Sequence, residues 1–185
     1  MKITGENQIA ATPQQVWEAL NDPVVLRQSI PGCESLEKIS DSEFKAKVVT
    51  KIGPVKTTFN GEVTLSDLDP PHGYTLSGKG SGGSAGNAKG SAKVSLTPNG
   101  DGTLLSYNVD AQITGKIAQL GSRLIQGSAK MLAGKFFDNF EAVVTGPGSA
   151  EGTPAAAAVS GDSRMWIYVL AGAGLALIAA YLLAF

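Results

Sequence analysis

The sequence predicts an α+β fold in which an antiparallel sheet is folded around one long C-terminal helix. Six segments after residue 33 alternate apolar and polar residues with the period of two that is typical of strands. Turn-forming stretches such as 69–73 and 98–102 separate them. Through 117–144 the apolar residues instead recur every three or four positions, which indicates an amphipathic helix. Packing the sheet on that helix is the economical way to bury both apolar faces.

The N-terminal part is expected to hold one strand, 3–11, and two short helices. Thr12 is placed to cap the first helix, with Pro13 at its first position. The second helix, 24–29, ends before Pro31 because proline disfavours helix in the preceding residue. The six later strands are expected at residues 34–40, 43–53, 55–68, 73–82, 84–97 and 103–115.

Strand alternation assigns one face of the sheet to the interior. Lys45, Lys47 and Lys51 share one face of their strand, and Lys89 and Lys93 share one face of theirs, so these faces point to solvent. We interpret the lysines as keeping the sheet soluble, with a docking role as the alternative. Near its middle the opposite, inward set has small side chains, namely Ala46, Gly61, Gly78, Gly80, Ala88, Gly90 and Ala92.

The long helix is expected to face these small residues with glycines of its own. Glycine inside a helix costs roughly 1 kcal/mol relative to alanine, so three of them need a reason. Close packing of helix on sheet is one reason, and a space kept for an apolar ligand is the other. The glycines are Gly121, Gly127 and Gly134, and the apolar helix positions are Leu120, Leu124, Met131, Leu132, Phe136, Phe140 and Val143.

The candidate ligand-binding residues are taken from these inward faces. They are apolar, as a site for a hydrophobic molecule requires. The set is Trp17, Val48, Phe59, Leu76, Ala88, Ala92, Tyr107, Val109, Leu120, Leu124, Phe136 and Phe140.

The sequence motifs do not indicate residues for catalysis, for a cofactor or for a metal ion. The GxGxxG match at 78–83 continues into strand-like alternation instead of opening a helix, so we interpret it as a glycine-rich hairpin and not as a phosphate site. The single histidine, His72, lies in a turn with no cysteine nearby, and Cys33, the single cysteine, is more typical of a small buried thiol than of a nucleophile. A formal net charge of −1 without a basic run argues against nucleic acid.

The C-terminal part predicts a membrane tether. Residues 146–163 are rich in Gly, Pro, Ala and Ser, which is typical of a flexible linker and spans roughly 25 Å on average. The anchor is expected at 164–185, in which the stretch 165–185 carries no charge and is about 31 Å long as a helix. Arg164 precedes this stretch and the N-terminus lacks a signal peptide, so we expect the 1–145 domain on the cytoplasmic side of the inner membrane.

The chain resembles the CoxG family, the carbon monoxide dehydrogenase G subunits, of the START-like (SRPBCC) superfamily. The resemblance covers about residues 1–145. It rests on the motif IAATPQQVW at 9–17, on IPGCE at 30–34, on the glycine hairpin GKGSGGSAG and on LGSRLI at 120–125. The resemblance implies a helix-grip fold, with a seven-stranded sheet over an apolar cavity. A C-terminal membrane helix is found in some members of the family.

The resemblance also implies an accessory protein, without catalytic residues, that serves a CO dehydrogenase-type molybdenum hydroxylase. Three hypotheses follow. The protein is a tethered carrier of a quinone or another lipid, or an adaptor that only recruits the dehydrogenase to the membrane, or an enzyme, since START-like cyclases and hydrolases exist. The absence of a convergent acid–base pair in the sequence argues against the third.

Overall fold

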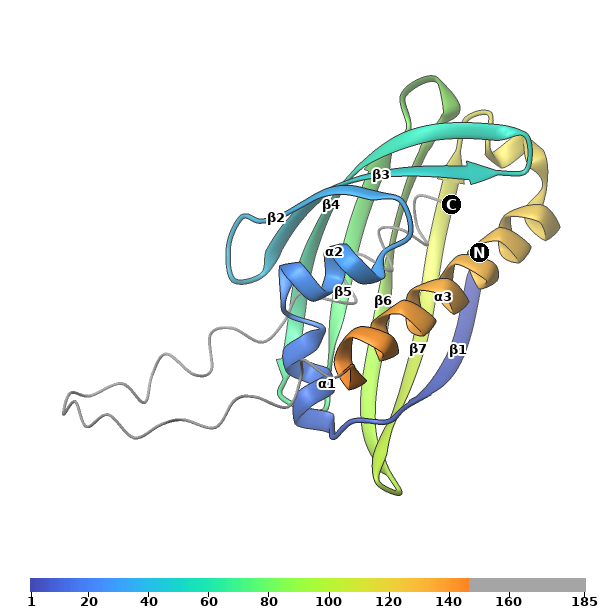
Figure 1. The fold of residues 1–185 in the computed structure, drawn as a ribbon. Coiled ribbons are helices and arrows are strands. Elements are labelled where there is room, and N and C mark those ends of the chain that lie inside the picture. The colour runs from blue at the N-terminus through green and yellow to red at the C-terminus, as the bar shows by residue number, and fades with distance from the viewer. Residues whose placement is uncertain (147–185) are drawn as a thin grey trace.

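The computed structural model describes residues 1–146, which form one curved sheet with three helices on its concave side (Figure 1). The chain order is that expected from the sequence: one strand, two short helices, six strands and a long helix. The strands are β1 (Lys2–Ile9), β2 (Cys33–Lys38), β3 (Glu43–Ile52), β4 (Val55–Asp69), β5 (Gly73–Ser81), β6 (Asn87–Asn99) and β7 (Gly102–Thr114). The helices are α1 (Pro13–Ala19), α2 (Pro23–Ser29) and α3 (Ser122–Thr145), with 3₁₀ turns η1 (Gly83–Ala85) and η2 (Ala118–Leu120).

The helix starts follow from local chemistry. The Thr12 side chain accepts a hydrogen bond from the backbone N–H of Gln15, which confirms Thr12 as the predicted N-cap of α1. The Gln15 side chain accepts one from the N–H of Thr12 in return, which completes a capping box. Asp22 caps α2 in the same way, by accepting from the backbone N–H of Val24. The expected continuous helix from 117 is interrupted at Gly121, whose φ of +87° suits glycine and separates η2 from α3.

All seven strands pair antiparallel, in the order β1-β7-β6-β5-β4-β3-β2. The first and last strands of the chain are neighbours, with Lys2 opposite Asp110. The sheet edges β1 and β2 are joined through α1 and α2, which lie at one end of the concave side (Figure 1).

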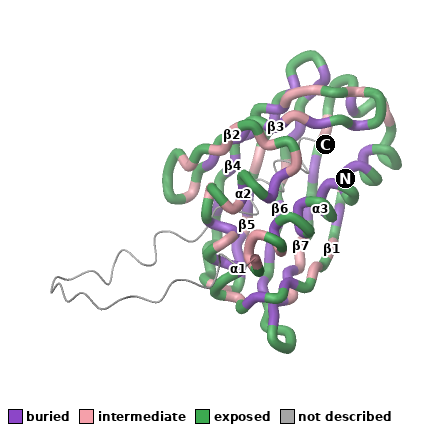
Figure 2. The backbone as a smooth tube through the Cα atoms, viewed as in Figure 1, coloured by how far each residue is buried: buried purple, intermediate pink, exposed green. Residues whose placement is uncertain are grey.

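Burial alternates along the strands as the sequence predicted (Figure 2). The inner residues of β3, from Phe44 to Ile52, are buried, whereas Lys45 and Lys47 are exposed. Of the small inner residues, most are buried, and Gly78 and Gly90 are half-buried. The prediction of which face points inward is therefore confirmed.

The face of α3 that packs on the sheet agrees with the expected one at Leu132, Phe136 and Phe140 and differs from it elsewhere. The helix buries Ile125, Ala129, Leu132, Phe136 and Phe140, together with their neighbours in the same stripe. The expected role of Gly121, Gly127 and Gly134 is wrong: all three are exposed, and a Cβ at any of them would meet nothing within 4 Å. Leu124 and Met131, which were expected inside, are 40% and 49% exposed. Glycine is neutral in an amphipathic pattern, so periodicity could not decide its side of the helix.

Candidate functional site

The predicted ligand-binding residues gather in the core between the sheet and the helices. Eleven of the twelve belong to one hydrophobic cluster, in which Tyr107 and Leu120 are half-buried and the others are buried. Leu124 is the exception: it lies at the exposed edge of α3, beside Gly53 in the β3–β4 turn. The structure thus brings the set together, and binding by it stays a prediction.

Aromatic side chains fill the end of this core near α1 and the C-terminal half of α3. Trp17 meets Tyr74 edge to face, with ring centroids 5.5 Å apart. Phe136 stacks on Phe140 at 5.6 Å, and Tyr107 stacks on Phe137 at 5.8 Å. Phe137 was not among the predicted residues, although its place next to Phe136 could have indicated it. Such pairs make this end of the core rigid and apolar.

Two polar atoms in this apolar end have no hydrogen-bond partner among residues 1–146. Trp17 is 0% exposed, and its Nε1–H donates to no atom of this part of the chain. Asn21, one turn further along the chain, donates from Nδ2 to the Trp17 carbonyl, but its Oδ1 is buried and unpaired. A buried donor without an acceptor is costly, so a hydrogen-bonding group on a guest molecule would be favourable here.

The small inner residues form a row across β3, β4, β5 and β6. Cα atoms of α3 come within 8 Å of Cα atoms of α1, α2, β1 and β3. Ala46, Gly61, Gly80 and Ala88 lie opposite one another across β3, β4, β5 and β6. This part of the inner face therefore carries little side-chain volume.

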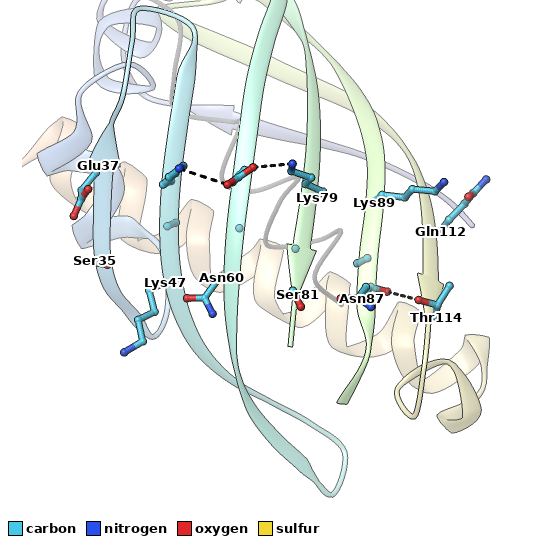
Figure 3. Close-up of a pocket in the computed structure, with 16 residues that line it drawn as sticks. Ser35, Glu37, Lys47, Asn60, Lys79, Ser81, Asn87, Lys89, Gln112 and Thr114 are labelled. Carbon is cyan, nitrogen blue, oxygen red and sulfur yellow. Dashed lines mark hydrogen bonds and ion pairs between the residues drawn. The ribbon is translucent and has the colours of Figure 1, made fainter. Parts of the chain in front are cut away.

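A second feature, which the sequence analysis did not predict, is an open groove of about 810 Å³ on the outer face of the sheet. Two rows of side chains flank it, and Figure 3 shows labelled members of both rows on neighbouring strands. One row contains Glu37, Lys45, Glu62, Lys79, Lys89 and Gln112, and the other contains Ser35, Lys47, Asn60, Ser81, Asn87 and Thr114. The floor between the rows is the backbone at Ala46, Gly61, Gly80 and Ala88. In the sequence, the alternation of lysines along the strands could have indicated this groove, but we interpreted these lysines chiefly as keeping the sheet soluble.

Ion pairs order one half of this outer groove. Glu62 Oε1 lies 3.5 Å from Lys45 Nζ, and Glu62 Oε2 lies 2.8 Å from Lys79 Nζ. The hydrogen bond from Lys79 and the charges of Lys79 and Lys45 lower the pKa of Glu62, and the same hydrogen bond raises the pKa of Lys79. Lys47 pairs with Glu34 at 2.8 Å. Within residues 1–146 no carboxylate pairs with Lys89.

The residues considered for chemistry lie apart from one another. Burial raises the pKa of the half-buried Cys33 thiol, an effect that the positive charge of Arg27 opposes, and its Sγ donates to the Ser35 carbonyl at 3.4 Å. His72 is exposed in its turn, with Nδ1 3.6 Å from Asp69. Residues 1–146 hold no group of three or more His, Cys, Asp or Glu arranged to bind a metal ion.

Comparison with known proteins identifies the family. The model of the CoxG family, the carbon monoxide dehydrogenase G subunits, matches residues 5–145. The chain belongs to this family. The match covers the whole sheet apart from the first residues of β1, together with all three helices, so the CoxG assignment rests on the folded domain. A search of curated proteins gave no match.

Solved structures share the fold of the CoxG-family domain. A conserved protein from Geobacillus kaustophilus is similar at 33% identity and a TM-score of 0.74, over 78% of this chain and 95% of that protein. The Zhui aromatase/cyclase from Streptomyces sp. R1128 is similar at 12% identity and a TM-score of 0.58, over 83% of this chain and 99% of that protein. Ara h 8.0201 is similar at 18% identity and a TM-score of 0.57, over 78% of this chain and 97% of that protein. The last two likenesses show the fold alone.

The expected membrane anchor, 164–185, and the linker, 146–163, lie outside the described residues apart from Gly146. Within residues 1–146, none of the helices combines the length and the apolar character that crossing a bilayer requires.

Proposed function

We propose that this CoxG-family protein is a non-enzymatic carrier, tethered to the membrane, that holds a quinone or a similar hydrophobic molecule between its sheet and α3 and serves a CO dehydrogenase-type molybdenum hydroxylase. The observation that carries the proposal is the inner face of β3–β6. It is apolar, and its middle bears only alanine and glycine. A hydrophobic guest would supply the volume that the side chains leave out.

The unpaired indole N–H of Trp17 supports a guest with an oxygen atom over a plain hydrocarbon. A quinone carbonyl is an acceptor and would satisfy this buried donor at the aromatic end of the core. The family supports the partner, since proteins named for carbon monoxide dehydrogenase are expected to act beside that enzyme. A soluble dehydrogenase cannot reach a quinone dissolved in the bilayer, so a carrier would connect the two.

Ala92→Trp tests the interior site. Ala92 is buried on β6 between Leu76 of β5 and Val109 of β7, so an indole there would occupy the space proposed for the ligand. We expect the variant to fold, to lose quinone binding in a titration with a short-chain quinone, and to copurify with no lipid detectable by mass spectrometry.

Ser91→Trp is the matched control because Ser91 directly precedes Ala92 in β6 and faces solvent. It should leave quinone binding unchanged. If Ala92→Trp does not fold, Ala92→Leu offers a milder filling of the same space. Unchanged binding in a folded Ala92 variant would refute the interior site.

The alternative function is an adaptor that recruits the dehydrogenase without carrying a ligand. The outer groove favours it, because a polar groove suits a protein partner and needs no guest inside the domain. Mass spectrometry of extracted lipids separates the two functions: an empty domain that still binds the dehydrogenase would leave only the adaptor.

The tether is tested by deleting 165–185. The shortened protein should remain in the supernatant when membranes are pelleted. A shortened protein that still pellets with membranes would contradict the anchor.

A further inference from the structure

The outer groove has the dimensions of a site for one extended polypeptide segment. It crosses six strands, from β2 to β7, which at about 4.8 Å per strand gives a length of roughly 24 Å. Its two flanking rows are two residues apart along each strand, which separates them by roughly 6.7 Å. This spacing is well below the diameter of an α-helix with its side chains, about 10 Å, so an extended chain suits the groove better than a helix does. At about 3.3 Å per residue, the groove would hold about seven extended residues.

The charges of the groove define the chemistry of its occupant. Four lysines and two glutamates line it, which leaves a net charge of +2. Glu62 is shared by Lys45 and Lys79, whereas Lys89 on β6 has no carboxylate partner among residues 1–146. Asn87 and Gln112 lie beside Lys89 in the groove lining (Figure 3) and offer amide groups to a polar chain. Asn87 keeps its side chain available, because its hydrogen bond with the Thr114 hydroxyl uses its backbone carbonyl.

Other classes of partner fit this groove less well. A bilayer surface is flat and does not follow a groove between two rows of side chains that are two residues apart. Four lysines against two glutamates are also far fewer positive charges than a nucleic acid backbone requires, because each phosphate contact needs its own basic group. The helices all lie on the opposite face of the sheet, so within residues 1–146 nothing covers the groove (Figure 1).

From these observations, we infer that the outer groove docks an extended, acidic segment of the dehydrogenase, with a carboxylate of that segment against Lys89. This inference rests on the proposed partnership with a CO dehydrogenase-type enzyme and adds the surface through which it forms. It places the partner on the outer face of the sheet and leaves the inner face free for a hydrophobic guest.

The test is a charge reversal, Asn87→Asp with Lys89→Glu, in the full-length protein reconstituted in nanodiscs. Binding to the purified dehydrogenase is measured by biolayer interferometry at low and high salt. We expect the double variant to bind about tenfold more weakly than the unaltered protein at low salt, and to show a smaller salt dependence. Quinone binding should be unchanged, because both residues face away from the core.

Lys130→Glu is the matched control because Lys130 is an exposed lysine on α3, which packs on the other face of the sheet. It should bind the dehydrogenase as the unaltered protein does. An unchanged affinity of the double variant, or an equal loss in the control, would overturn the groove as the docking site and leave the proposed function intact. Failure of the unaltered protein to bind the dehydrogenase would overturn the partnership itself. If the double variant lost only its binding to anionic phosphatidylglycerol vesicles and kept its binding to the dehydrogenase, the groove would be a lipid-facing surface and the inference would be overturned.

Discussion

Replacing Gly127 and Gly134 of α3 by alanine should stabilise the domain. Both glycines lie inside the helix, both are exposed, and an added Cβ at either would meet nothing within 4 Å. Alanine restricts the unfolded chain more than glycine does, and here it adds no clash in the folded state. The opposite result would follow if these glycines allowed close contact between the helix and the sheet, as their positions in the sequence first indicated.

The magnitude follows from the helix propensities. Glycine is about 0.8–1.0 kcal/mol less favourable than alanine in a helix interior, so the double substitution should raise the free energy of unfolding by about 2 kcal/mol. The two positions are seven residues apart, about 10 Å along the helix, so their effects should add. For a domain near 150 residues, this corresponds to an increase in Tm of roughly 4–8 °C.

Thermal and urea unfolding followed by circular dichroism measure the effect. Gly32→Ala is the control, because Gly32 has a φ of +77° and a Cβ there would collide with the Val49 carbonyl oxygen. This control should lose stability. A double α3 variant that also lost stability would refute our assignment of the helix faces.

Two further predictions concern buried polar groups. Trp17→Phe keeps the aromatic packing but removes the unpaired indole N–H, so the affinity for a quinone should fall by roughly twofold to tenfold while binding of a hydrocarbon of equal size stays constant. An equal effect on both probes in titration calorimetry would contradict a hydrogen bond to the ligand. Cys33 should react more slowly with iodoacetamide at pH 8 than a free cysteine, because burial raises the pKa of its thiol and reduces the thiolate fraction. A rate equal to that of free cysteine would contradict this protection.

The sequence by itself determined the elements of the domain and the two faces of the sheet. Alternation is regular in β3, where each outer lysine is flanked by inner residues that are buried in the structure. The starts of α1 and α2 depend on Thr12 and Asp22, whose capping bonds are local. Both signals act over two to four residues, so a single sequence contains them completely.

Tertiary structure decided what depends on contacts between distant residues. The pairing of β1 with β7 joins residues more than one hundred positions apart, such as Lys2 and Asp110. The outer groove exists only because the register of β2–β7 aligns two polar rows across six strands. The side of α3 that carries Gly127 and Gly134 was likewise fixed by packing, since glycine has no side chain whose burial could be foreseen. Local patterns define which residues share a face, and the long-range register and packing determine what that face meets.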